Sequence, residues 1–161
     1  MFVQNVLKAK SCYMYEQSRH LTDDPAVSDT INGKKWPSVA IVILNWNGLN
    51  FLQQFLPSVL ASTYPNKRLI VADNASTDDS ISFLQQNFPQ VEILQHTTNE
   101  GFAKGYNSAL EIIQSDYYVL LNSDVEVEPG WIEPVITLME SNAIIGACQP
   151  KLLSYAHRRE F

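Results

Sequence analysis

Short apolar runs alternate with helical patterns along most of the chain, from residue 36 onward. Five strands are predicted by continuous β-rich runs, at residues 39–44, 69–72, 91–94, 117–121 and 144–148. Four helices are predicted by apolar residues that recur every three or four positions, over residues 51–60, 81–88, 102–113 and 131–139. Strands that alternate with helices indicate an α/β fold with a mostly parallel sheet and flanking helices.

Two helix starts carry local signals. Pro57 lies inside the first helical pattern, so we expect a kink or a later helix start there. Ser76 and Asp79 have the spacing of a capping box ahead of the second helix. Asp78 and Asp79 also fall in the first turn of that helix, where carboxylates complement the helix dipole.

The first 36 residues lack a sustained period and contain turn signals at residues 23–25 and 32–33. We expect an N-terminal extension that is irregular or partly helical, with a short helix around residues 5–19 as one option. The periodic part, residues 37–161, is long enough for one domain with its own core.

The net charge of the chain indicates which classes of ligand it binds. The chain has 161 residues, of which 45% are hydrophobic, and a net charge of −6. It therefore lacks the basic surface of a nucleic-acid-binding protein. An acidic protein still binds phosphates where a metal ion supplies the positive charge.

Nothing in the sequence suggests export or a membrane span. No apolar run reaches transmembrane length, and the first seven residues lack the long apolar region of a signal peptide. Cys12 and Cys148 match no zinc spacing, which favours a reduced, cytoplasmic setting with a buried thiol at Cys148. Two interactions remain alternatives: residues 1–36 contact the inner face of the membrane, or the chain forms an oligomer with copies of itself.

Polar residues gather directly after the predicted strands. Because the carboxyl ends of parallel strands meet at one edge of a sheet, we expect these residues to form one site. The candidates are Asn45, Asn47, Asp73, Asn74, Asn99, Gly101, Lys104, Gly105, Asn122, Ser123 and Asp124.

The two carboxylates among them are the most informative. A carboxylate at the end of a buried strand is poorly solvated and needs a metal ion, donors or a cationic partner. Asp124 is therefore a candidate for holding a divalent cation against a phosphate. Asp73 is a candidate for accepting an N–H group from a base or bonding a ribose hydroxyl. Asn45 and Asn47 have an equally good explanation as turn formers.

The third predicted helix begins with small residues. Gly101 and Gly105 allow close approach of the backbone, so a phosphate at the free N–H groups and tight helix packing are the two alternatives. Lys104 either contacts a phosphate or is simply solvated, and solvation is the commoner state of a single lysine. Trp46 and Tyr106 are able to stack on a base or sugar, although we favour core packing for both.

Taken together, these residues resemble the family 2 glycosyltransferases with a GT-A fold. The resemblance covers roughly residues 38–155 and is carried by four segments, ILNWNG (43–48), VADNASTD (71–78), NEGFAKGYN (99–107) and LLNSD (120–124). It implies a Rossmann-like half that binds a nucleotide-diphosphate sugar, and transfer of the sugar to a glycan or lipid-linked acceptor in cell-surface polysaccharide synthesis. It also implies that Asp73 contacts the nucleoside, and that Asp124 is the last carboxylate of a D-x-D motif that holds Mg²⁺ or Mn²⁺.

The sequence departs from the family pattern in two ways. Asn122 stands where the family often has the first Asp of that motif, which removes one negative charge from the metal site. The chain ends at Phe161, and no residue matches the family's catalytic base. Glu126 and Glu128 are better explained as solvated positions of an alternating segment. We therefore expect the donor-binding half of an inverting enzyme, incomplete at its C-terminus and inactive in isolation.

Two other functions compete with this one. A non-catalytic module that binds sugar nucleotides, or that assembles with a partner chain, would bind the donor without turnover. A dinucleotide-dependent oxidoreductase would need a G-x-G-x-x-G turn after the first strand, and residues 45–48 read Asn-Trp-Asn-Gly instead.

Overall fold

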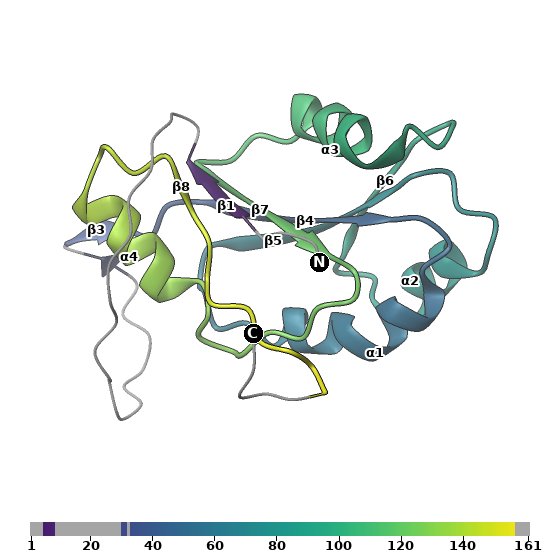
Figure 1. Cartoon of the computed structure of the whole chain (residues 1–161), viewed down its shortest axis with the longest axis horizontal. Helices are drawn as coiled ribbons and strands as arrows, with labels where there is room; N and C mark the ends of the chain where they lie inside the picture. Colours follow the sequence, from purple (N-terminus) through teal and green to yellow (C-terminus); the bar gives the residue numbers. More distant parts are fainter. Residues whose placement is uncertain (1–4, 9–29, 32, 157–161) are drawn as a thin grey trace.

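A parallel sheet of four strands forms the centre of the protein, as the alternating pattern predicted (Figure 1). The computed structural model describes residues 5–8, 30–31 and 33–156. The four parallel strands are β4 (Val39–Asn45), β5 (Lys67–Asp73), β6 (Glu92–Gln95) and β7 (Tyr117–Asn122). The helices are α1 (Leu49–Leu60), α2 (Ser80–Asn87), α3 (Gly101–Ile112) and α4 (Glu133–Ser141).

The order of the strands creates a reversal point at one edge of the sheet. The chain runs outward from β4 to β5 and β6, and β7 then returns to the other side of β4, which gives the order β6-β5-β4-β7-β1-β8. The direction of winding therefore reverses between β4 and β7. Open α/β sheets bind their ligands outside the carboxyl ends of the strands at such a reversal.

The N-terminal extension contributes a strand to this sheet, which the sequence did not predict. Asn5–Lys8 forms β1, which pairs antiparallel with β7 on one side and with β8 (Ala147–Cys148) on the other. A helix starting at residue 5 is therefore wrong, because the backbone of this segment instead pairs with the otherwise open edge of β7. The rest of the expected helix, and Cys12, lie outside the described residues. Thr30–Ile31 (β2) and Lys34–Lys35 (β3) form a separate antiparallel pair.

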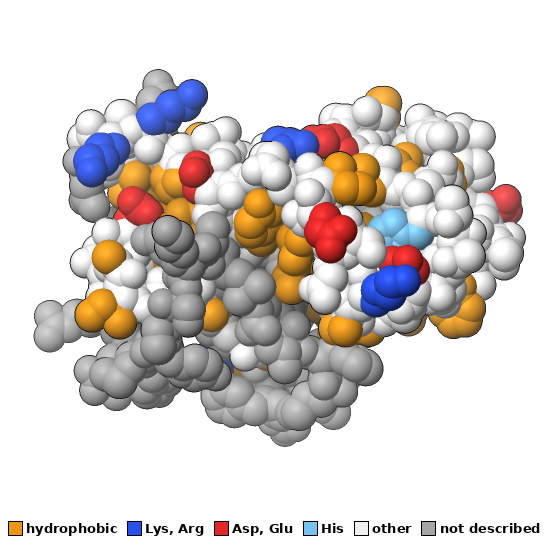
Figure 2. All heavy atoms as spheres, turned by 90° about the horizontal axis from the view of Figure 1, so that it is seen from above, with side chains coloured by type: hydrophobic (Ala, Val, Ile, Leu, Met, Phe, Trp, Pro, Cys, Tyr) orange, Lys and Arg blue, Asp and Glu red, His pale blue; other side chains and the backbone are white. Residues whose placement is uncertain are grey.

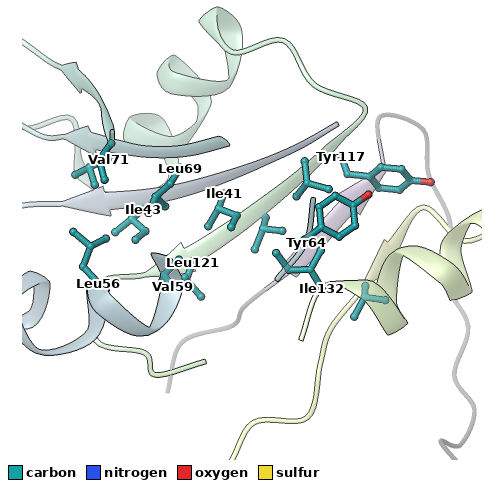
Figure 3. Close-up of a cluster of buried hydrophobic side chains, with 14 of the residues drawn as sticks. Ile41, Ile43, Leu56, Val59, Tyr64, Leu69, Val71, Tyr117, Leu121 and Ile132 are labelled. Atoms are coloured by element: carbon teal, nitrogen blue, oxygen red, sulfur yellow. The ribbon is translucent and has the colours of Figure 1, made fainter. Parts of the chain in front are cut away.

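Helices cover both faces of the sheet and divide the core in two (Figure 1). The larger cluster lies between the sheet and the helices α1, α2 and α4, and includes Ile41, Leu56 and Leu121 (Figure 3). The smaller cluster lies under α3 and includes Val42, Tyr106 and Ala109. Seen from the α3 side, apolar side chains remain exposed, because one helix covers only part of this face (Figure 2).

Three local expectations need correction. Helix α1 begins at Leu49, well before Pro57, so the proline lies inside it and does not delay its start. Asp79 is the N-cap residue of α2 but makes no capping hydrogen bond, and Ser76 bonds to the neighbouring loop instead, so the capping box is wrong. The fifth strand begins only at residue 147, because a turn at Asn142 binds the N–H groups of the two following isoleucines.

The described part of the chain contains no helix that is long and apolar enough to cross a membrane. Its cysteine, Cys148, is a free thiol that is only partly buried, and burial raises its pKa.

One buried and one exposed isoleucine test the assignment of the hydrophobic core. Ile41 is fully buried in the middle strand, whereas Ile112 at the end of α3 is 66% exposed. We expect Ile41→Ala to lower the free energy of unfolding by about 2–5 kcal/mol, because it leaves a cavity in the larger cluster. Ile112→Ala removes the same atoms and should change it by less than about 0.5 kcal/mol. Urea denaturation followed by circular dichroism measures both values, and equal losses would contradict the assigned core.

Candidate functional site

The loops that follow β4, β5 and β7 lie at one edge of the sheet. The strand register places Asn45 of β4 opposite Asp73 of β5, and Leu44 opposite Asn122 of β7. The β6 register ends at Gln95, also opposite Asp73. The carboxyl ends of the four parallel strands, and the polar residues that directly follow them, therefore lie at one edge of the sheet.

A buried hydrogen-bond network joins the first two loops, and we call Asn45, Asp73 and Ser76 the Asp73 network. The Asp73 carboxylate is 2% exposed. Its Oδ1 accepts hydrogen bonds from Asn45 Nδ2 at 3.0 Å and from Ser76 Oγ at 2.6 Å, and its Oδ2 accepts one from the Ser76 N–H at 2.9 Å. These donors offset the cost of burying the negative charge. Oδ2 keeps acceptor capacity for a further donor.

Asn45 is fully buried and holds the network from the β4 side. Its Nδ2 also donates to Ser76 Oγ at 3.1 Å, and its main-chain carbonyl accepts the N–H of Asn74. Its side-chain Oδ1 has no hydrogen-bond partner among the described residues. A β-carbon at Gly48 would lie 2.4 Å from this oxygen, so a side chain at that position would force the Asn45 amide to move.

Asn47 is used within the loops. It has a left-handed backbone with a φ of 50°, and its Oδ1 accepts the N–H groups of Thr77 and Asp78. Asp78 in turn accepts the N–H groups of Leu49 and Ser80. Burial opposes ionisation of Asp78, but these hydrogen bonds outweigh it and lower the pKa of the carboxyl. The structure thus favours the turn-forming interpretation of Asn47 and shows Asp78 joining the first turns of two helices.

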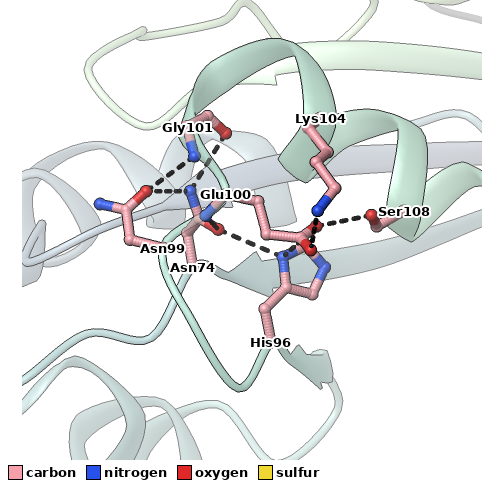
Figure 4. Close-up of polar contacts among 7 residues, drawn as sticks. All are labelled: Asn74, His96, Asn99, Glu100, Gly101, Lys104 and Ser108. Carbon is pink, nitrogen blue, oxygen red and sulfur yellow. Dashed lines mark hydrogen bonds and ion pairs between the residues drawn. The ribbon is translucent and has the colours of Figure 1, made fainter.

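Asn74 joins the end of β5 to the start of α3 (Figure 4). Its Nδ2 donates to Asn99 Oδ1 at 2.8 Å and to the carbonyl of Gly101 at 3.1 Å. Its Oδ1 accepts the N–H of Glu100 at 2.9 Å and lies 3.2 Å from Nδ1 of His96. Because Asn74 is 2% exposed and bonded through both polar atoms, its visible role is to fix the loop that precedes α3.

The glycines of α3 have different roles. Gly101 has a φ of +75°, a conformation that suits glycine, and the space around it is open. A β-carbon at Gly105 would come within 2.9 Å of Leu44, so Gly105 permits tight packing of α3 on the sheet. Lys104 is largely exposed and forms an ion pair with Glu100 at 2.9 Å. Hydrogen bonds from Ser108 and Lys104 lower the pKa of Glu100.

The segment after β7 is arranged differently from the other loops. In the part of the chain that the structure describes, the side chains of Asn122, Ser123 and Asp124 have no hydrogen-bond or ion-pair partner, and Asp124 is exposed. Ser123 faces the β4 loop, since its Oγ lies 3.8 Å from the position of a β-carbon on Gly48. Among the described residues, these three polar side chains at the reversal point are thus left without a protein partner.

A metal ion at this rim would depend on its ligand as well as on the protein. Among the described residues, no group of three or more His, Cys, Asp or Glu side chains is placed to hold a metal ion. Mg²⁺ in nucleotide sites is commonly held by one or two carboxylates together with substrate phosphates and water. The single exposed carboxylate of Asp124 fits that arrangement and does not fit a cage built from protein side chains alone.

One residue at the site differs from the sequence interpretation, and one was missed. Trp46 is 58% exposed, so core packing is wrong for it, because the residue lies in the tight turn after β4. Tyr106 is buried as predicted. Ser76 was missed as a site residue, since its spacing suggested a helix cap. Its position three residues after Asp73 is the one signal that pointed to a contact with that carboxylate.

Comparison with known proteins assigns the chain to a family. An uncharacterized glycosyltransferase of Haemophilus influenzae is 27% identical over 114 residues, which are 69% of this chain and 35% of that protein. The putative teichuronic acid biosynthesis glycosyltransferase TuaG of Bacillus subtilis is 27% identical over 106 residues, which are 64% of this chain and 42% of that protein. The chain thus spans less than half the length of these curated relatives.

Solved structures share the fold. Mannosyltransferase PcManGT from Pyrobaculum calidifontis, in complex with GDP-Man and Mn²⁺, superposes on 56% of this chain and 28% of its own with a TM-score of 0.52 and 23% identity. S. aureus TarS in complex with UDP-GlcNAc superposes on 66% of this chain and 32% of its own with a TM-score of 0.60 and 17% identity. The family model for glycosyl transferase family 2 matches residues 38–159. This chain belongs to glycosyl transferase family 2.

Proposed function

We propose that this chain forms the donor-binding part of a glycosyltransferase that acts in cell-surface polysaccharide synthesis. The donor is a nucleotide-diphosphate sugar, and the acceptor is a glycan or a lipid-linked saccharide. Family membership supports glycosyl transfer. Similar proteins include one named for teichuronic acid biosynthesis and an Escherichia coli chondroitin synthase, which supports a polysaccharide product. The proposed location is the cytoplasm, at the inner face of the membrane where the acceptor is lipid-linked.

The observation that carries this proposal is the placement of Asp73 and Asp124 on one rim, on either side of β4. Asp73 is rigidly held and retains acceptor capacity, which suits recognition of an N–H group of a base or a ribose hydroxyl. Asp124 is exposed and unpaired within the described residues, which suits a cation that arrives with its phosphates. A nucleotide that spans the rim would meet both groups.

The remaining residues of the rim have proposed roles around the diphosphate. Gly101, whose own N–H bonds to Asn99 Oδ1, would let the first turn of α3 approach the phosphate oxygens, with Lys104 nearby. Asn122 and Ser123 would bond the ribose or the donor sugar, and the exposed ring of Trp46 would stack on the base or sugar. Asp124 would hold Mg²⁺ or Mn²⁺, which when bound offsets the charge that builds on the departing diphosphate.

We propose an inverting reaction. The acceptor hydroxyl would attack the anomeric carbon from the face opposite the diphosphate, which the rim holds in place. A base is needed to remove the hydroxyl proton, and we assign that role to no residue of this chain. The rim described here would supply binding and orientation of the donor.

The metal site is tested by the removal of one carboxylate. For the wild type, we expect calorimetry with a panel of nucleoside diphosphates to show binding of one nucleotide that strengthens in Mn²⁺. Asp124→Ala should abolish this strengthening, with a loss of about tenfold or more in the Mn²⁺-dependent affinity, because the ion loses its protein ligand. Glu128→Ala removes the same charge from an exposed position four residues away and serves as the control. Equal, weak binding of every nucleotide by the wild type, with or without Mn²⁺, would contradict the proposed function.

The Asp73 network is tested by the removal of one hydroxyl. Ser76→Ala deletes the hydrogen bond from the hydroxyl to Asp73 Oδ1 and the two that the hydroxyl accepts, from Asn45 Nδ2 and the Asn47 N–H. It should weaken nucleotide binding by about five- to tenfold, both with and without Mn²⁺. Ser82→Ala removes a hydroxyl from the exposed side of α2, where it bonds to the Asp79 carbonyl, and should leave binding unchanged. The same calorimetry measures both variants. Unaltered affinity in Ser76→Ala would show that the network does not orient the ligand.

A further inference from the structure

The hydroxyl of Tyr106 lies beneath the rim, at the junction of β4 and β7. Tyr106 belongs to α3 and is 3% exposed. Its hydroxyl donates a hydrogen bond to the carbonyl of Leu121 at 2.9 Å and accepts one from the N–H of Leu44 at 3.4 Å. Burial raises the pKa of the phenol to about 12, with a smaller contribution from the negative charge of Asp124. The hydroxyl therefore stays protonated and acts as a hydrogen-bond donor at neutral pH.

These two partners lie at the carboxyl end of the pairing between β4 and β7. The register places Leu44 opposite Asn122. In a parallel pair with this register, the N–H of Leu44 faces the carbonyl of Leu121. Tyr106 bonds to both of these groups, so α3 supports the end of the pairing between β4 and β7, just before the two strands continue into their loops.

The end of β7 is one of the two places that hold the Asp124 segment, the other being its packing and hydrogen bond near Val127. Within the described residues, the side chains of Asn122, Ser123 and Asp124 make no hydrogen bond that would hold the segment from outside. After Asp124, Val125 packs against the larger cluster and the Val127 N–H donates to Ser58 Oγ at 3.2 Å. Tyr106 acts on the fixed point that precedes Asp124, the end of β7. The other loops of the rim are held differently, by the Asp73 network and by the hydrogen bonds of Asn74.

We propose that Tyr106 is a positioning residue that sets how Asp124 presents its carboxylate to a metal-bound diphosphate. This inference rests on the proposed function. The same helix begins at Gly101, on the side where we propose that the phosphates bind. Helix α3 would therefore help to position both the backbone near the phosphates and the Asp124 carboxylate. Removal of the hydroxyl should therefore affect the metal-dependent part of nucleotide binding and spare the metal-independent part.

Tyr118 provides a matched control. It lies on β7 at the opposite end of the strand, and its hydroxyl also bonds to two main-chain groups. It donates to the carbonyl of Ile113 at 3.0 Å and accepts the N–H of Ser115 at 3.2 Å. Tyr118→Phe and Tyr106→Phe thus delete the same kind of contact, and both should cost stability. Only Tyr106 reaches the strand end that leads to Asp124.

The test compares Tyr106→Phe, Tyr118→Phe and the wild type for the affinity of the preferred nucleoside diphosphate, by calorimetry, with and without Mn²⁺. We expect Tyr106→Phe to weaken binding in Mn²⁺ by about ten- to a hundredfold and to change metal-free binding by less than about twofold. Tyr118→Phe should change neither. A second measurement is the concentration of free Mn²⁺ by electron paramagnetic resonance, in the presence of the nucleotide. It should show weaker Mn²⁺ binding in Tyr106→Phe and not in Tyr118→Phe.

Three results would overturn the inference. Wild-type Mn²⁺ dependence in Tyr106→Phe would show that the hydroxyl does not position Asp124, and the proposed function would stand. An equal loss with and without Mn²⁺ would show a general structural role. Absence of metal-dependent binding in the wild type would remove the proposed function, and this inference with it.

If Tyr106→Phe does not fold, a measurement on the wild-type protein tests the same inference. Tyrosine labelled with ¹³C at Cζ gives a signal for Tyr106 that is assigned through its contact with the ring of Phe102, 5.1 Å away. This signal should shift when Mg²⁺ is added to the nucleotide-bound protein, whereas the Tyr118 signal should not. An unchanged Tyr106 signal would overturn the inference.

Discussion

The hydrogen bonds around the buried Asp73 carboxylate are the contact on which the rest of this rim depends. A carboxylate that is 2% exposed is costly without donors, and here the donors come from its own loop and from the neighbouring strand. Ser76 supplies two of them, and Asn45 supplies the third from the end of β4. The network therefore joins the two loops that a nucleotide would meet first, and satisfies a charge that would otherwise destabilise the sheet end.

The rim has one closed side and one open side. On the β5 and β6 side, Asp73, Asn74 and Asn99 are bonded to protein groups, so this part is fixed before a ligand arrives. On the β7 side, Asp124 and its neighbours have no such partners within the described residues. Such a division suits a ligand whose nucleoside is recognised by preformed contacts, and whose phosphates bring a cation that completes the open side. The α3 helix links the two sides.

Local patterns predicted the parallel sheet, its helices and the shared rim, because these depend on periodicity and on the rules that connect parallel strands. They failed where a distant segment decides the outcome. β1 became a strand because the edge of β7 accepts it, which no property of residues 5–8 alone reveals. Ser76 matched a capping box by spacing, but the buried carboxylate of Asp73 competes for its hydroxyl.

The same reasoning explains the polar and aromatic residues of the loops. Asn47, for which turn formation was the equal alternative, has a left-handed backbone and accepts the N–H groups of Thr77 and Asp78. Asn74 accepts the N–H of Glu100 and so fixes the loop before α3. Trp46 was expected in the core because it is large and apolar, yet the turn that follows β4 directs it to solvent. Asp124 remained a ligand candidate because nothing in the described protein competes for it.

The central claim is that one nucleotide diphosphate lies across this rim with its cation at Asp124. Diffraction from crystals soaked with Mn²⁺ and the preferred nucleoside diphosphate, collected at the manganese absorption edge, tests it directly. The account predicts an anomalous peak within bonding distance of the Asp124 carboxylate and of the phosphate oxygens, with the nucleoside against Asp73. A peak at the opposite end of the sheet, near Tyr64 and Glu133, or a nucleotide bound away from Asp73, would contradict it.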